Sequence, residues 1–257
     1  MNKVKKKEII IDRENLPLEA FLAVARDCVP VKLSGDRAFR QGLHHSVDML
    51  KNAIHNGIPV YGVSTGYGKS CGIRLTRDQV LNYQGASPVC FHGCGTGEPI
   101  GIEATRAAML CRLVCLSRGY SAVTLGLLEQ LAAFLNLGIT PVVPAEGSVG
   151  ASGDLTPMSY VAATLSGERE VFYEGRRMPA AEALQKTGLK PYRFAPKEGI
   201  AMLNGTSTMT GLAILAVERA GRILEGNIAA TALTVHALKG KALHFHPTVG
   251  EAKPHPG

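Results

Sequence analysis

The chain has 257 residues, of which 46% are hydrophobic and 19% charged, so it can bury a sizeable core and is globular, not disordered. Lysine and arginine outnumber aspartate and glutamate by 28 to 21, giving a net charge of +7, but four of the lysines lie in residues 1–7, which we expect to form a solvated tail. The sequence lacks tryptophan and a basic stripe interleaved with aromatic residues, which argues against nucleic-acid binding, and the positive charge favours anionic substrates such as carboxylates.

Cysteine usage and hydropathy predict a reduced, cytoplasmic setting. The six cysteines follow a charged N-terminus that does not lead into an apolar stretch, so no signal peptide is expected. The longest uncharged run, residues 199–217, contains Asn204 and several hydroxyl side chains, so no membrane span is expected. Cys90, His92 and Cys94 lie at every second residue, without the longer spacers of a closed zinc site, so we predict no metal.

Hydrophobic periodicity predicts a mainly α chain. In residues 36–55, for example, Phe39, Leu43 and Val47 recur at helical spacing along one face. Helices are predicted, in chain order, over residues 17–28, 36–55, 76–84, 103–118, 124–137, 155–165, 179–186 and 207–238. A short strand is predicted over residues 58–63 and an exposed hairpin over residues 171–178. The last helix would be roughly 45 to 50 Å long, so it needs neighbouring helices to cover it.

Two glycine clusters resemble nucleotide-binding loops but fail their spacing. In residues 62–70 the ending Gly-Lys-Ser suits a phosphate-binding loop, yet Gly62 stands one residue too early. In residues 93–97 the dinucleotide fingerprint would need a glycine or alanine where Glu98 stands. We therefore predict no nucleotide cofactor.

Residues 147–154, Gly-Ser-Val-Gly-Ala-Ser-Gly-Asp, combine three glycines and two serines directly before the predicted helix at Leu155. Such a segment takes tight backbone conformations that only small residues allow. The nitrogen of Gly153 could attack the carbonyl of Ala151, and loss of water from the ring and from Ser152 would leave an exocyclic methylidene. That group is an electrophile, which no encoded side chain supplies. The alternative is an ordinary loop before a helix capped by Asp154.

Three segments together resemble the aromatic amino acid ammonia-lyases and aminomutases, the family that acts on histidine, phenylalanine and tyrosine. Residues 147–159 resemble the signature in which Ala-Ser-Gly becomes 4-methylidene-imidazole-5-one (MIO). Residues 61–68, Tyr-Gly-Val-Ser-Thr-Gly-Tyr-Gly, resemble the family's mobile loop, and residues 197–207 resemble its Leu-x-Asn-Gly-Thr segment. Because all three segments match, we reject the alternative that residues 147–154 are an ordinary loop.

The resemblance implies a role for each matching residue. Besides the tripeptide Ala151, Ser152 and Gly153, it implies two catalytic residues: Tyr61, which would help to remove a β-proton, and Asn204, whose amide would bond the substrate amine or the ring. Gly68 would let the mobile loop close over the substrate, and His92 would hydrogen-bond the substrate's side-chain ring. Taken alone, the same residues also suit a core tyrosine, an Asn-Gly turn and a structural histidine.

The reaction implied is elimination of ammonia from a small aromatic amino acid to give an arylacrylate. Residues 206–211 and 158–160 look closer to the phenylalanine and tyrosine members, so we expect tyrosine first, giving 4-coumarate, and then phenylalanine, giving cinnamate. A histidine ammonia-lyase giving urocanate, an aromatic 2,3-aminomutase and a non-catalytic assembly subunit are the alternatives.

The resemblance also implies a domain plan. A basic tail, residues 1–10, would precede an MIO-bearing N-terminal domain of helices with small strands and hairpins, residues 11–195. Residues 196–257 would begin a central helical bundle, shared between the subunits of a homotetramer. Members of the family continue far beyond this length, so we expect either a fragment or one chain of a split enzyme, with an active site that is incomplete without its C-terminal half.

Overall fold

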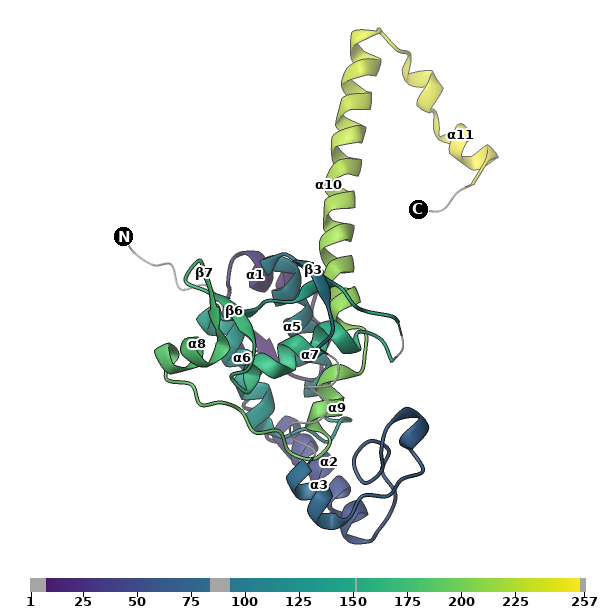
Figure 1. The fold of residues 1–257 in the computed structure, drawn as a ribbon. Helices are drawn as coiled ribbons and strands as arrows, with labels where there is room; N and C mark the ends of the chain where they lie inside the picture. Colours follow the sequence, from purple (N-terminus) through teal and green to yellow (C-terminus); the bar gives the residue numbers. More distant parts are fainter. Residues whose placement is uncertain (1–7, 84–92, 151, 255–257) are drawn as a thin grey trace. The chain divides into compact units, whose positions relative to one another are not determined.

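The structure is a computed structural model, and it describes residues 8–83, 93–150 and 152–254. The chain divides into two compact units, one that extends to Ile214 and one from Leu215 onward. Both are mainly helical, as predicted (Figure 1).

The helices in the ranges that the structure describes follow the predicted order closely. They are α1 (Leu18–Arg26), α2 (Arg37–His55), α3 (Arg77–Tyr83), α5 (Ile102–Ser117), α6 (Leu125–Leu137), α7 (Leu155–Leu165), α8 (Ala180–Thr187), α9 (Glu198–Leu203), α10 (Ser207–Ala237) and α11 (Pro247–Ala252), with the short 3-10 turns η1 (Gly68–Ser70) and η2 (Ala242–Phe245). Their ends have local causes. Asp36 accepts a hydrogen bond of 2.8 Å from the Phe39 nitrogen at the start of α2, and Gly138 ends α6 in the left-handed region with φ of 72°.

In the described part of the chain, seven short strands form three small sheets. They are β1 (Ile9–Ile11), β2 (Val31–Leu33), β3 (Thr96–Pro99), β4 (Thr140–Pro141), β5 (Pro144–Glu146), β6 (Glu170–Tyr173) and β7 (Arg176–Pro179). Strands β1 and β2 pair in parallel, β3 pairs antiparallel with β5, and the order β4-β6-β7 forms an antiparallel sheet. The hairpin expected at residues 171–178 is therefore β6–β7. Ile9 and Ile10, the last residues of the expected tail, pair with Val31 and Lys32 in β1–β2.

The strand predicted over residues 58–63 is wrong. Residues 61–64 form a turn, in which the Ser64 nitrogen donates to the Val60 carbonyl at 2.9 Å and the Ser64 hydroxyl accepts from the Val60 nitrogen at 2.8 Å. Gly62 allows this turn because its φ of 64° is left-handed. The apolar residues that suggested a strand thus belong to a closed loop.

The core of the first unit surrounds α5 and α7, which are buried on almost every side. Helix α5 packs against α1 and α6, and α7 packs against α9 (Figure 1). Small residues such as Ala107, Ala108, Ala162 and Ala163 allow this close helix packing. The helix that follows the Ala-Ser-Gly tripeptide therefore starts from a rigid interior.

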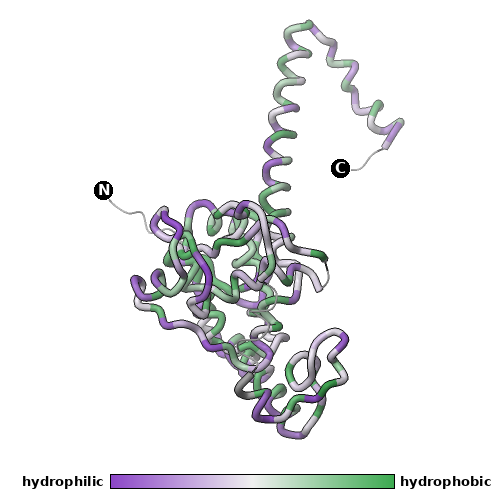
Figure 2. The backbone as a smooth tube through the Cα atoms, in the orientation of Figure 1, coloured by the Kyte–Doolittle hydropathy of each residue, from purple (hydrophilic) through white to green (hydrophobic). Residues whose placement is uncertain are grey.

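The second unit contains most of α10, followed by η2 and α11. Apolar and polar residues alternate along α10 (Figure 2). Many apolar side chains of this unit are exposed in the chain as it stands: Val217, Ile223, Leu224, Ile228, Leu233, Leu238, Leu243, Phe245 and Val249. None of the helices in the described residues combines the length and the apolar character that crossing a membrane requires.

Candidate functional site

Ser152 and Gly153 lie directly against Gly205. Gly153 and Gly205 form an isolated parallel bridge, in which the Gly205 nitrogen donates to the Ser152 carbonyl at 3.0 Å and the Asp154 nitrogen donates to the Gly205 carbonyl at 2.7 Å. Ala151 lies outside the described residues. Two segments that are 50 residues apart in sequence, and that were singled out separately, thus meet in the fold.

The backbone at this contact is strained and tightly enclosed. Ser152 has φ of 54°, which costs a residue with a side chain about 1 to 3 kcal/mol, and Gly153 has φ of 86°. A Cβ atom on Gly153 would lie 2.1 Å from the Gly205 carbonyl oxygen, so only glycine fits. In a parallel bridge the hydrogen bonds go through the neighbours of the paired residue, so the Gly153 nitrogen lies outside this ladder. That nitrogen is the atom that ring closure would use.

Asp154 has a different role from the one predicted. It stands at the N-cap position of α7, but its side chain makes no capping bond there. Its buried carboxylate instead accepts a hydrogen bond of 2.9 Å from the Met209 nitrogen, in the first turn of α10. The expectation that Asp154 caps its own helix is therefore wrong, because its carboxylate instead accepts from an N–H group in the first turn of α10, where N–H groups have no partner within their own helix.

Asn204 stands at the C-terminal end of α9. Its side-chain amide donates to the Ile200 carbonyl at 3.0 Å. The backbone carbonyl of Asn204 accepts from Arg112 Nη1 at 2.6 Å. Arg112 belongs to α5, is only 2% exposed, and also donates to the Ala201 carbonyl at 3.2 Å. The guanidinium thus caps the last carbonyl groups of α9.

Arg112 was missed from the sequence. The available signal was a charged residue inside a helix that is otherwise rich in alanine, leucine and cysteine, since a buried arginine must find carbonyl or carboxylate partners. Nothing in the sequence, however, indicated which segment those partners would come from.

Tyr61 and Gly68 are close together within one loop. The Gly68 nitrogen donates to the Tyr61 hydroxyl at 3.1 Å, and the Tyr61 side chain is 56% exposed. The ring of Tyr67 meets that of Tyr61 edge to face at 6.4 Å, and burial, with a smaller effect of Tyr61, raises the pKa of Tyr67. A Cβ atom on Gly62 would lie 2.5 Å from the Ile200 side chain, so the loop lies against α9, the helix that ends at Asn204.

His92 lies outside the described residues, but the segment that follows it is placed. The Tyr160 hydroxyl donates to the carbonyl groups of Gly93 and Gly95, each at 3.2 Å. A Cβ atom on Gly147 would lie 2.9 Å from the Gly95 Cα, so this segment runs beside the start of the tripeptide loop. Within residues 8–83, 93–150 and 152–254, no group of three or more His, Cys, Asp or Glu side chains is arranged to hold a metal ion.

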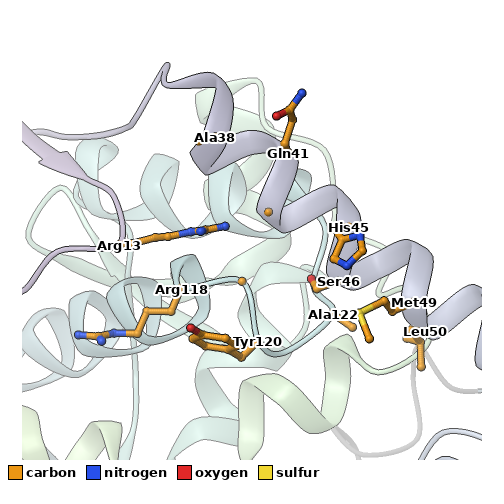
Figure 3. Close-up of a pocket in the computed structure, with 12 residues that line it drawn as sticks. Arg13, Ala38, Gln41, His45, Ser46, Met49, Leu50, Arg118, Tyr120 and Ala122 are labelled. Atoms are coloured by element: carbon orange, nitrogen blue, oxygen red, sulfur yellow. The ribbon is translucent and has the colours of Figure 1, made fainter.

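A separate pocket of about 860 Å³ lies between α2 and the turn after α5 (Figure 3). The Arg13 side chain points toward α2, where a Cβ atom on Gly42 would lie 1.3 Å from its Nη2. None of the predicted site residues that the structure describes lines this pocket. The candidate site is instead the contact between residues 152–154 and 204–205.

The described residues thus place a strained Ser-Gly turn at the head of α7 against an Asn-Gly turn at the end of α9, and a glycine-rich loop lies against α9. The comparisons with known proteins assign the family. Residues 16–257 match the family model described as aromatic amino acid lyase. The chain belongs to the aromatic amino acid lyase family.

Individual relatives support this assignment. The chain is 40% identical over 249 residues to a protein of Thermoplasma acidophilum named probable histidine ammonia-lyase. The matched region covers 97% of this chain and 50% of that protein. It is 37% identical to the histidine ammonia-lyase of Myxococcus xanthus, over 97% of this chain and 48% of that protein. The solved structure of tyrosine aminomutase from Streptomyces globisporus superposes with a TM-score of 0.89 at 35% identity, over 97% of this chain and 46% of the other.

The chain spans about half the length of the curated relatives that it matches. The family match and the superposed structure confirm the expected mainly α fold and the expected family. The choice of tyrosine as the first substrate is not confirmed, because the curated relatives named here are histidine ammonia-lyases.

Proposed function

We propose that this chain supplies the MIO-forming part of an ammonia-lyase that eliminates ammonia from an aromatic amino acid, with histidine as the first candidate substrate. The observation that carries the proposal is the bridge between Gly153 and Gly205, which holds the Ser152 carbonyl on the Gly205 nitrogen and leaves the Gly153 nitrogen outside the ladder.

The residues present fit the prosthetic group. Ring closure needs a glycine at position 153, and the enclosed backbone there admits no side chain. It also needs a turn that brings residues 151 and 153 together, for which the left-handed Ser152 is suited. The ring, when formed, supplies an electrophilic methylidene that makes the amino group of the substrate a better leaving group.

The chain's own residues would orient the substrate and move a proton. The Gly205 N–H group would hydrogen-bond the carbonyl oxygen of Ser152, and the side-chain amide of Asn204 would hydrogen-bond the substrate amine. Tyr61 would take the β-proton, and the Gly68 N–H group would stabilise charge on its phenol oxygen. His92 would select the ring by a hydrogen bond to an imidazole or a phenol.

Histidine precedes tyrosine in this proposal because the curated relatives carry that name, and the product would then be urocanate. The 35% identity to tyrosine aminomutase keeps a second candidate, in which the amine returns to the β-carbon. The two differ in product, an arylacrylate with free ammonia or a β-amino acid.

The complete active site would need residues beyond these 257, in the same polypeptide or in a complementary chain. The exposed apolar side chains of the second unit suit a bundle with further helices, and we propose a tetrameric assembly. Turnover of an aromatic amino acid by the purified 257-residue chain alone would contradict this part of the proposal.

Intact mass tests the proposal most directly. We expect the chain to weigh about 36 Da less than its sequence predicts, because two waters are lost, and we expect Ser152→Ala to abolish the loss of the second water, about 18 Da, which comes from the Ser152 hydroxyl. An unaltered mass in the native assembly would instead support a non-catalytic subunit. In that assembly, ammonia and product should be measured for histidine, tyrosine and phenylalanine; a specificity constant for tyrosine far above that for histidine would reverse our ranking.

A further inference from the structure

Arg112 is connected to Ser152 through a single peptide group. Its Nη1 donates to the Asn204 carbonyl at 2.6 Å, and the nitrogen of that same peptide group belongs to Gly205, which donates to the Ser152 carbonyl at 3.0 Å. A positive charge therefore lies at one end of a chain of two hydrogen bonds, and the Ser152 oxygen lies at the other. Hydrogen bonds in such a chain polarise and strengthen one another.

The local packing holds the guanidinium against this peptide. A Cβ atom on Gly205 would lie 2.9 Å from both Nη1 and Nη2 of Arg112, and the φ of Gly205 is 131°, so glycine is required there. Arg112 Nε and Nη2 are buried and have no hydrogen-bond partner among the described residues. The residue is thus buried at a cost that its structural bonds to α9 do not fully offset.

The guanidinium remains charged in this position. Burial lowers the pKa of Arg112, whereas the nearby Cys115 and Asp154 raise it. Arginine does not lose its proton in proteins, so a full positive charge is held behind the Asn204–Gly205 peptide. The low dielectric of the interior strengthens its effect on that peptide.

We propose that Arg112 is a positioning residue for ring formation, which acts through the Asn204–Gly205 peptide on the Ser152 carbonyl. The inference rests on the proposed function and concerns the second loss of water. In that step the Cα–H bond of Ser152 breaks and its proton passes to water. Negative charge then develops on the Ser152 oxygen, the Cα–Cβ double bond forms, and Oγ leaves as hydroxide, which takes a proton back from water, so that one water is released in all. The polarised Gly205 N–H group stabilises the charge on the Ser152 oxygen.

Arg106 offers a matched control in the same helix. It is also 2% exposed, and it also donates to backbone carbonyl groups, those of Val24 at 2.7 and 3.1 Å and of Leu135 at 3.1 Å. Its hydrogen bonds stabilise α1 and α6, and their acceptors, Val24 and Leu135, are not part of the contact between Ser152 and Gly205. A purely structural effect of removing a buried guanidinium should therefore appear in both variants.

The test follows the intact mass of the 257-residue chain over time after synthesis, for wild type, Arg112→Gln, Arg112→Lys and Arg106→Gln. We expect the wild type and Arg106→Gln to lose two waters. In Arg112→Gln the second loss should be slowed at least about tenfold, so that a species about 18 Da lighter than the linear chain accumulates, and Arg112→Lys should recover part of the rate.

The outcomes separate this inference from the proposed function. If the wild type loses no water, both are overturned for this chain. If Arg112→Gln loses two waters as fast as Arg106→Gln, the role of Arg112 is overturned and the proposed function stands. Should Arg112→Gln fail to fold, the soluble Arg112→Lys variant decides, because lysine lacks the rigid planar guanidinium that is packed against Gly205 and bonded to the Asn204 carbonyl. A wild-type rate in that variant would overturn the inference, and a slowed second loss would support it.

Discussion

Replacement of Gly153 by alanine should prevent ring formation and destabilise the first unit. The added Cβ would lie 2.1 Å from the Gly205 carbonyl oxygen, so the two backbones must separate. Separation breaks the two hydrogen bonds of the bridge, at about 1 kcal/mol each, and φ of 86° costs alanine about 1 to 2 kcal/mol more. We expect a loss of about 3 to 4 kcal/mol in the free energy of unfolding.

Gly150→Ala is the matched control for this change. Gly150 also has a left-handed φ, of 72°, but a Cβ atom there meets no atom within 4 Å. It should therefore cost about 1 to 2 kcal/mol of backbone strain alone and leave the loss of two waters intact. Urea denaturation followed by circular dichroism, together with intact mass, measures both effects. Equal stabilities and equal masses for the two variants would show that the contact with Gly205 is not what makes position 153 special.

Three further changes test other parts of the chain. Glu198→Ala should lower the free energy of unfolding by about 3 to 5 kcal/mol, because it leaves the nitrogen and hydroxyl of Thr124 and two other donors without their buried acceptor; a loss under about 1 kcal/mol in urea denaturation would contradict this. Asp154→Asn should cost about 1 to 2 kcal/mol through the weakened bond to the Met209 nitrogen, and an unchanged melting temperature would count against that bond. Burial raises the pKa of Cys111 to about 12, so this thiol holds its proton more tightly in the folded state. The contribution of the Cys111 thiol to stability should be full below about pH 8.5 and be lost as the pH rises toward 12. Iodoacetamide at pH 8 should not label this thiol in the folded chain, and rapid labelling at that pH would show that the site opens.

The helices were the most predictable part of the fold. Helix α7 begins and ends where its apolar run does, and α10 ends one residue before the predicted boundary, because periodicity and flanking glycines are local signals. The pairing of β1 with β2 was missed, since three-residue strands carry too little pattern to reveal a partner some twenty residues away. Helix α9 was also missed; it is six residues long and follows Lys197 with φ of 82°, a conformation that sequence does not reveal.

The candidate site was predictable in its segments and not in its contacts. The Ala-Ser-Gly and Asn-Gly segments could be named because their residue types are unusual and match a family. Their meeting through Ser152 and Gly205 is a tertiary contact between residues 53 positions apart, and no local rule specifies it. Arg112 and the bond from Met209 to Asp154 depend on how α5 and α10 pack, so they required the fold.

One carboxylate connects the start of α10 to the turn at residues 152–154. Asp154 receives the Met209 N–H group from the first turn of α10, while its own N–H group is bonded to Gly205. A rotation of that first turn would therefore pull on the residue next to Gly153. Substitutions that change the pitch of α10 near Ser207 should therefore also change the geometry of the turn at residues 152–154.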